Sequence, residues 1–207
     1  MSKEDTRTEY AIWLELFAVG ILSVWAVGRC PYFPGDVVVE RWAQSLFSGD
    51  LAWARGVSTS AEFPRLLIVL AIVAALSWAF AGWRAGLVSV VSLAGMLALG
   101  MWLGPVVGRP RPSPELVHVA KQLSGYSFPS LFALRYAATF GFLAILAIVR
   151  TSGTRRAAIP IVCAALLVIG FLARIALAAH WPSDVVISYY MGLVWAALLV
   201  RVGVRAS

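Results

Sequence analysis

The stretch that decides the fold is 66–108, which reads LLIVLAIVAALSWAFAGW from 66 to 83 and AGLVSVVSLAGMLALGMWLGPVVG from 85 to 108. Only Arg84 separates the two uncharged runs. About 20 consecutive apolar residues suffice to span the hydrocarbon core of a bilayer. The whole chain is 61% hydrophobic and 13% charged, against roughly 45–50% and 25% in soluble domains. The sequence therefore predicts an integral membrane protein and excludes soluble globular, disordered and collagen-like chains.

Working outward from these two runs gives six apolar segments of spanning length. They lie at about 10–29, 65–83, 85–106, 127–149, 157–178 and 183–203. The segment 31–64 mixes apolar with charged residues, which predicts an amphipathic stretch lying at the membrane surface. No repeat of 20 to 50 residues and no break in composition occurs. We therefore expect an all-α integral membrane protein, a six-transmembrane helix bundle with a single membrane domain over 1–207.

The basic residues predict the orientation of the bundle. The chain carries 17 Lys plus Arg against 10 Asp plus Glu. In a membrane protein such an excess reflects cytoplasmic loops and anionic headgroups, so we expect no nucleic-acid partner. Arg84 and the basic loop 150–156 fall on the side of the N-terminus, which predicts cytoplasmic termini. The segments 31–64, 107–126 and 179–183 then share the outer, periplasmic face of a bacterial-type inner membrane.

Polar residues that the bilayer should exclude gather at this outer face. They are Arg109 after the third span, Ser130 at the start of the fourth, Arg174 near the end of the fifth, and His180 and Asp184 around the start of the sixth. Guanidinium groups pair bidentately with phosphate, and helix N-termini present unpaired N–H groups. Ionisable groups at membrane depth mark function by default. We therefore expect an anion site for a phosphate at headgroup level.

His180 is the reactive candidate of this set. Imidazole can attack phosphorus, and Asp184 can hold the other ring nitrogen and stabilise the cation that forms. Pro182 suits the first position of a helix, which would place Asp184 in the first turn, close to His180. Taken singly, a His and an Asp at a span end indicate only residues of the headgroup layer. Together with Arg109 and Arg174 on the same face, they favour a catalytic site.

These residues resemble the motifs of the type 2 phosphatidic acid phosphatases, membrane lipid phosphatases related to vanadium haloperoxidases and bacterial acid phosphatases. The family motifs are Lys, six residues, Arg-Pro; then Pro-Ser-Gly-His; then Ser-Arg, five residues, His, three residues, Asp. The corresponding stretches here are 102–110, 129–132 and 173–184. The resemblance extends over about 65–203, and the third motif is its specific part.

The resemblance implies a six-helix fold, a phosphohistidine on His180 and phosphate contacts from Arg109, Ser130 and Arg174. It implies no metal and no other cofactor. Cys30 and Cys163, the only cysteines, suggest neither a disulfide framework nor a zinc site.

The first two motifs are degenerate. Trp102 stands where the family has Lys, Leu131 and Phe132 stand where it has Gly-His, and Ala173 stands where it has Ser. The missing His is the family's general acid, and losing a general acid costs about two to four decades in rate. A diphosphate suffers less than a monoester, because phosphate leaves well without a proton. Trp102 is either an aromatic wall over a lipid chain or a tryptophan of the interfacial belt.

Other side chains are possible substitutes for the missing groups. Beside His180 the chain has one histidine, His118, and its lysines are Lys3 and Lys121. His118 and Lys121 lie in the predicted outer loop 107–126 and are candidates to replace the missing general acid, with Glu115 as a weaker candidate. The alternative is that they are solvated loop residues.

Arg135 lies one helical turn after Phe132, inside a predicted span where an arginine is costly. It either supplies charge to the site or pairs with Glu15, the other charged residue that we expect to be buried.

Two functions stay open at this point. The first is a membrane lipid phosphatase or phosphotransferase that acts on a lipid phosphate or diphosphate through a phosphohistidine. Isoprenyl diphosphates, phosphatidate, phosphatidylglycerol phosphate and lipid A phosphates are the substrates that the resemblance implies. The second is a catalytically weakened or inactive family member that binds lipid phosphates as a transport or scaffold subunit. Membrane lipids are the other expected partners, and the sequence predicts no oligomeric state.

Overall fold

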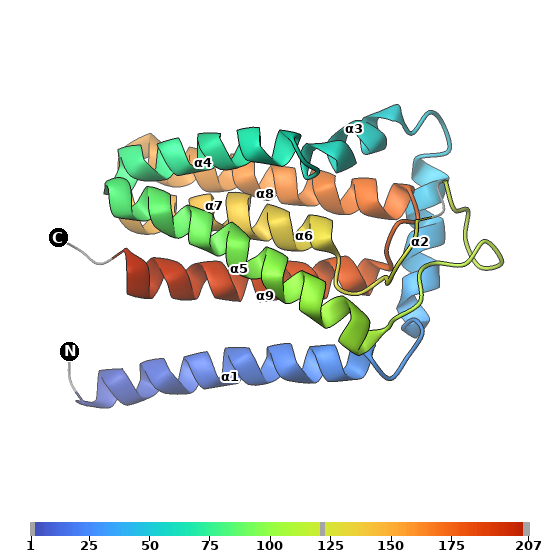
Figure 1. The fold of residues 1–207 in the computed structure, drawn as a ribbon, viewed down its shortest axis with the longest axis horizontal. Helices are drawn as coiled ribbons and strands as arrows, with labels where there is room; N and C mark the ends of the chain where they lie inside the picture. Colours follow the sequence, from blue (N-terminus) through green and yellow to red (C-terminus); the bar gives the residue numbers. More distant parts are fainter. Residues whose placement is uncertain (1–2, 121–122, 205–207) are drawn as a thin grey trace.

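The structure, a computed structural model, describes residues 3–120 and 123–204. In Figure 1 the long helices lie side by side and α2 lies across one end of the bundle. The α-helices of the described residues are α1 (Lys3–Val27), α2 (Pro34–Leu46), α3 (Ala52–Ser60), α4 (Arg65–Ala81), α5 (Trp83–Val107), α6 (Leu131–Tyr136), α7 (Phe142–Arg150), α8 (Gly153–Ala176) and α9 (Pro182–Gly203). A short π-helix, η1 (Ala137–Gly141), joins α6 to α7.

Five helical segments are long and apolar enough to cross a membrane. They are Asp5–Val27 of α1, α5, the continuous segment Leu131–Arg150, α8 and α9. The helices α3 and α4 are long and apolar enough to cross a membrane only when they are taken together, and the chain bends by 61° at the break between them. The predicted all-α membrane fold is therefore confirmed, with five spans, or six when the bent pair counts as one.

Small residues let the central rod α6–η1–α7 approach α9 closely. A Cβ added to Gly192 would lie 2.5 Å from the Cβ of Ala137, and one added to Gly141 would lie 2.5 Å from a methyl carbon of Leu193. Such close helix approaches are typical of membrane bundles, where packing replaces the hydrophobic driving force. This contact holds the rod and α9 together and brings the starts of α6 and α9 to the same end of the bundle (Figure 1).

The amphipathic segment 31–64 forms α2 and α3, and α2 turns its acidic side chains inward. Asp36 and Glu40 are buried, whereas Val38 is 68% and Trp42 is 59% exposed. An exposed apolar face suits the interfacial region of a bilayer, where tryptophan is enriched. The acidic face is buried because it meets polar groups at the start of α9: Asp36 accepts hydrogen bonds from both the backbone and the hydroxyl of Ser183.

The loop between α5 and α6 is tied to α2. The side chain of Gln44 donates to the carbonyl oxygen of His118 at 2.8 Å and accepts from its backbone N–H at 3.1 Å. Arg41 donates to the carbonyl oxygen of Leu116 at 2.8 Å. The part of this loop that precedes residue 121 is therefore held against α2, at the end of the bundle where α6 and α9 begin.

Candidate active site

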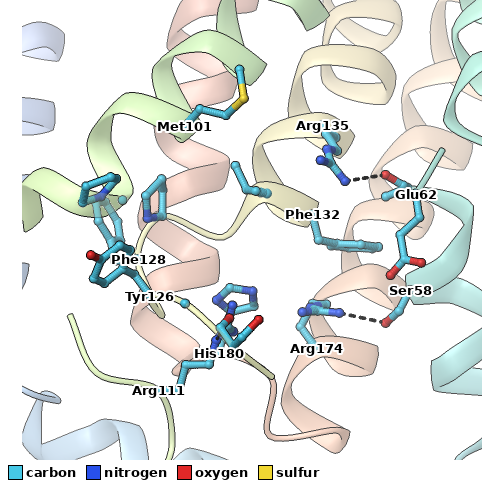
Figure 2. Close-up of a pocket in the computed structure, with 18 residues that line it drawn as sticks. Ser58, Glu62, Met101, Arg111, Tyr126, Phe128, Phe132, Arg135, Arg174 and His180 are labelled. Carbon is cyan, nitrogen blue, oxygen red and sulfur yellow. Dashed lines mark hydrogen bonds between the residues drawn. The ribbon is translucent and has the colours of Figure 1, made fainter. Parts of the chain in front are cut away.

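A cavity of about 420 Å³ lies at this end of the bundle. Its wall comes from α3, the break between α3 and α4, α5, α6, α8, the loop between α5 and α6, and the loop before α9. Three arginines, Arg111, Arg135 and Arg174, line the cavity together with His180 (Figure 2). A concave site with convergent polar groups is the default location of catalysis or binding.

His180 is buried in the wall of this cavity, with 4% of its surface exposed. Its Nδ1 is hydrogen-bonded to the carbonyl oxygen of Ser127. A carbonyl only accepts, so Nδ1 carries the proton and Nε2 keeps its lone pair. Burial, followed by the positive charges of Arg174 and Arg111, lowers the pKa of His180 well below its ordinary value of 6.5. The imidazole is therefore neutral at pH 7, as a nucleophile must be.

Arg174 and Arg111 are the guanidinium groups that act on His180. Arg174 donates to the hydroxyl of Ser58 at 3.1 Å, and its Nε has no hydrogen-bond partner among the described residues. Arg111 donates to the carbonyl oxygens of Ala179 and Ser124. Within the part of the chain that the structure describes, neither arginine forms an ion pair. Both retain their positive charge for an anion in the cavity.

Arg135 completes the set from the other side of the Phe132 ring (Figure 2). It donates to the carbonyl oxygen of Ala61 at 2.8 Å, and its Nε has no partner among residues 3–120 and 123–204. The alternative that Arg135 pairs with Glu15 is wrong. Glu15 is exposed on α1, and only 6% of the apolar stretch of this helix is buried within the protein.

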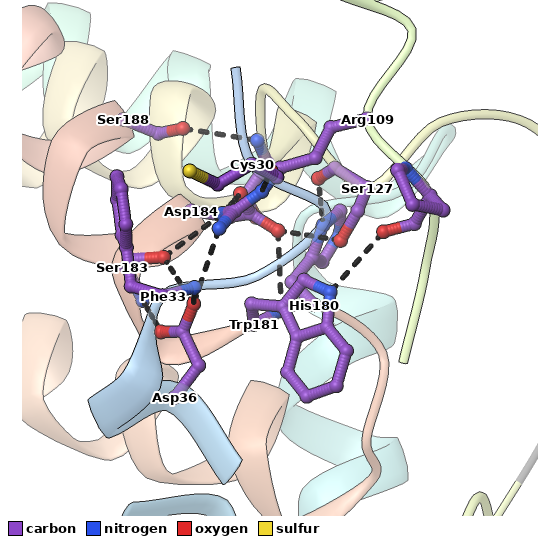
Figure 3. Close-up of polar contacts among 12 residues, drawn as sticks. Cys30, Phe33, Asp36, Arg109, Ser127, His180, Trp181, Ser183, Asp184 and Ser188 are labelled. Carbon is purple, nitrogen blue, oxygen red and sulfur yellow. Dashed lines mark hydrogen bonds and ion pairs between the residues drawn. The ribbon is translucent and has the colours of Figure 1, made fainter. Parts of the chain in front are cut away.

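Arg109 lies outside the cavity, in a buried polar network (Figure 3). Its side chain is fully buried and forms ion pairs with Asp36, at 3.2 Å, and with Asp184. It also donates to the carbonyl oxygen of Cys30 and to the hydroxyl of Ser183. The expectation that Arg109 contacts a phosphate in the cavity therefore differs from the structure, because two buried carboxylates already neutralise this guanidinium.

Asp184 is also buried and hydrogen-bonded within this network. Besides Arg109, its oxygens accept from the hydroxyl of Ser127 and from the backbone N–H of Trp181 (Figure 3). The partner of the His180 ring is thus the Ser127 carbonyl, and the predicted pairing of Asp184 with His180 needs correction. Asp184 reaches the histidine only indirectly, by holding Ser127.

Ser130 caps a helix and is not part of the cavity wall. Its hydroxyl accepts from the N–H of Ala133 at 3.4 Å, and its own N–H donates to the hydroxyl of Ser188 at 2.9 Å. Its side chain is fully buried, so it fixes the start of α6 against α9. Of the five residues expected to converge, the structure brings His180 and Arg174 to the cavity and places Arg109, Ser130 and Asp184 behind its wall.

Two of the auxiliary candidates in the loop between α5 and α6, His118 and Glu115, do not line the cavity. His118 and Glu115 are exposed, and Lys121 lies outside the described residues. Trp102 is 63% exposed on α5 and lines a separate apolar groove beside α1. Among residues 3–120 and 123–204, no three His, Cys, Asp or Glu side chains are grouped to hold a metal ion.

Sequence reasoning missed three contributors to this region. Arg111 sits two residues after Arg109 in Gly-Arg-Pro-Arg-Pro, so the motif was visible, but it does not reveal which arginine faces the cavity. Glu62 lines the cavity from the break between α3 and α4. Asp36 gave no signal, because its partner Ser183 is 147 residues away in the chain.

Comparisons with known proteins agree with this architecture. A family model described as PAP2 superfamily matches residues 85–206. A solved structure is also similar, the "first transmembrane PAP2 type phosphatidylglycerolphosphate phosphatase from Bacillus subtilis", with a TM-score of 0.71, 17% sequence identity, and coverage of 90% of this chain and 93% of that chain. No curated protein matches the sequence. The family model covers more than half of the chain and the solved structure shares its fold, so the protein belongs to the PAP2 superfamily.

Proposed function

We propose that the protein hydrolyses a lipid phosphate or diphosphate, or transfers its phosphoryl group, through a phosphohistidine on His180. One observation carries the proposal: a neutral, buried imidazole shares a cavity with three arginines that form no ion pair with any described residue. Unpaired cations are expensive away from water. An anion that enters the cavity would pair with them, and a phosphate fits the guanidinium geometry.

The chemistry follows from the free nitrogen. With the phosphate held by Arg174 and Arg111, Nε2 of His180 attacks phosphorus, and the bond from phosphorus to the leaving oxygen breaks. The Nδ1–H of His180 stays on the Ser127 carbonyl while the ring becomes a cation. Water then attacks phosphorus, the P–N bond breaks, and inorganic phosphate leaves; an acceptor hydroxyl in place of water gives phosphotransfer. The arginines stabilise the charge on the transferred phosphoryl group.

No histidine stands at the family's general-acid position to protonate the leaving group. Phe132 occupies the position that holds the general acid in the family, and a phenyl ring donates no proton. A leaving phosphate needs protonation far less than a leaving alkoxide does. The proposed enzyme therefore acts on diphosphates better than on monoesters.

We place the reaction at the outer leaflet. Arg150 at the end of α7 and Arg155 and Arg156 at the start of α8 lie at the opposite end of the bundle from the cavity, and basic residues at span ends stay cytoplasmic. Met101 lines the cavity and is 66% exposed on α5, so apolar surface adjoins the site, where a lipid chain can lie.

A second candidate function is a lipid-phosphate binder with little or no turnover, as a transport or scaffold subunit. It is favoured because Asp184 forms an ion pair with Arg109 and has no direct hydrogen bond to the ring of His180. Such a protein keeps the arginines of the cavity. It lacks a carboxylate bonded directly to His180, and it lacks the general acid that the family has at the position of Phe132.

The deciding experiment is phosphate release by purified protein from lipid monophosphates and diphosphates, with and without chelator. His180→Ala should abolish release, whereas His118→Ala, at the other histidine of the chain, should not. Binding of these lipids without release, lost on Arg174→Gln, would support the binder instead.

A further inference from the structure

The ring of Phe132 divides the arginines of the cavity into two groups. The Arg174 guanidinium lies 5.4 Å from the centre of this ring, and Arg135, one helical turn after Phe132, lies beyond the ring (Figure 2). Arg174 and Arg111 are the arginines whose charge acts on His180. Arg135 therefore stands apart from the group that holds the reacting phosphate.

Arg135 is attracted by the carboxylate of Glu62, but it forms no ion pair with a described residue. It donates to one neutral acceptor, the carbonyl oxygen of Ala61, at the point where α3 bends into α4. Its Nε has no hydrogen-bond partner, and it forms no ion pair among the described residues. Among residues 3–120 and 123–204, the charged side chains of the cavity wall are Arg111, Arg135, Arg174 and the exposed Glu62. Three positive charges against one negative charge leave an excess of two positive charges, which favours an anion with several negative charges, such as a diphosphate.

We propose that Arg135 forms a second anion subsite, so that the cavity takes a diphosphate at the edge of the Phe132 ring, with one phosphate directed toward Arg174 and the other toward Arg135. This inference rests on the proposed function and names its substrate class. The terminal phosphate lies on Arg174 and Arg111 beside His180, and the phosphate attached to the lipid lies on Arg135. When Nε2 attacks the terminal phosphorus, the bridging P–O bond breaks and its electron pair goes to the lipid monophosphate. Arg135 stabilises the charge that the leaving phosphate gains, which makes a proton donor at Phe132 unnecessary.

A purely structural role is the competing account, because the same side chain bridges to the bend between α3 and α4. The chain offers a matched control for it. Arg150, at the opposite end of the bundle, also donates to one carbonyl oxygen, that of Val204, and also has a buried Nε without a partner among the described residues. A substitution at Arg150 therefore removes the same kinds of contact far from the cavity.

The test measures binding of inorganic pyrophosphate and orthophosphate to the purified protein in detergent by calorimetry. Wild type should bind pyrophosphate more tightly than orthophosphate. Arg135→Gln should weaken pyrophosphate binding roughly tenfold or more, the value of one charge-assisted hydrogen bond, and change orthophosphate binding less than about twofold. Arg150→Gln should change neither affinity, and Arg135→Lys should restore part of the pyrophosphate affinity.

Activity gives a second readout on a lipid monophosphate and a diphosphate with the same tail. Arg135→Gln should lower phosphate release from the diphosphate and spare the monophosphate. The inference is overturned if wild type binds pyrophosphate no more tightly than orthophosphate, or if Arg135→Gln weakens both anions equally. Failure of the proposed function has a different signature, namely phosphate release that survives His180→Ala or orthophosphate binding that survives Arg174→Gln.

Discussion

Replacing Arg109 by glutamine separates its structural role from a role in binding phosphate. Arg109 is fully buried and makes four hydrogen bonds, two of them in ion pairs with Asp36 and Asp184. Removing one partner of a buried ion pair costs about 3–5 kcal/mol, because the remaining charge stays buried and uncompensated. Here two carboxylates lose their cation at once. We therefore expect Arg109→Gln to destabilise the protein by at least about 3–5 kcal/mol.

The assay is unfolding of the purified variants in detergent, followed by helicity against temperature. Adding Asp36→Asn to Arg109→Gln removes one of the stranded charges, so the double variant should be more stable than the single variant. Arg111→Gln, which loses only hydrogen bonds to carbonyls, should unfold near wild type. The reasoning is refuted if Arg109→Gln unfolds like wild type yet loses phosphate binding, because Arg109 would then be a phosphate ligand.

Three further changes test other parts of the account. Arg111→Gln should raise the dissociation constant for orthophosphate roughly tenfold in calorimetry, since a charge-assisted bond is lost; unchanged affinity would remove Arg111 from the site. The pKa of Glu40 is raised to about 9, mainly by burial and also by the negative charges of Asp36 and Asp184. The unfolded chain therefore releases the Glu40 proton from about pH 4.5 upward, whereas the folded protein retains it at neutral pH. Wild type should then lose about 2–3 kcal/mol of stability relative to Glu40→Gln between pH 5 and pH 7, and an equal difference at both pH values would contradict the burial argument. Phe132→His should speed release from a lipid monophosphate more than from the matched diphosphate; equal gains in the two rates would show that a proton donor does not limit the monoester.

The membrane fold could be predicted because it depends on composition over long runs. The uncharged stretches 66–83 and 85–108 became α4 and α5, with the chain turning between Ala81 and Trp83. The burial of the acidic side chains of α2 could not be predicted. Asp36 is bonded to Ser183, which is 147 residues away in the chain, and a local sequence pattern carries no information on such a contact.

In the candidate site, too, local sequence spacing predicted some features and long-range contacts determined the others. The spacing of Arg174, His180 and Asp184 identified a phosphate-related motif, and two of the three side chains line or touch the cavity. The spacing could not show that Asp184 is held by Arg109 or that a backbone carbonyl takes its place on His180. Both outcomes depend on side-chain contacts between segments that are far apart in the chain.

A trapped bond between His180 Nε2 and phosphorus would be direct evidence for the proposed phosphohistidine. Purified protein is mixed with a lipid diphosphate labelled at its terminal phosphate, quenched in base within milliseconds to seconds, and digested for mass spectrometry. We expect an acid-labile, base-stable phosphate on the peptide that carries His180, present in His118→Ala and absent in His180→Ala. Phosphate release by His180→Ala at the wild-type rate, with no labelled peptide in either protein, would contradict the proposed phosphohistidine.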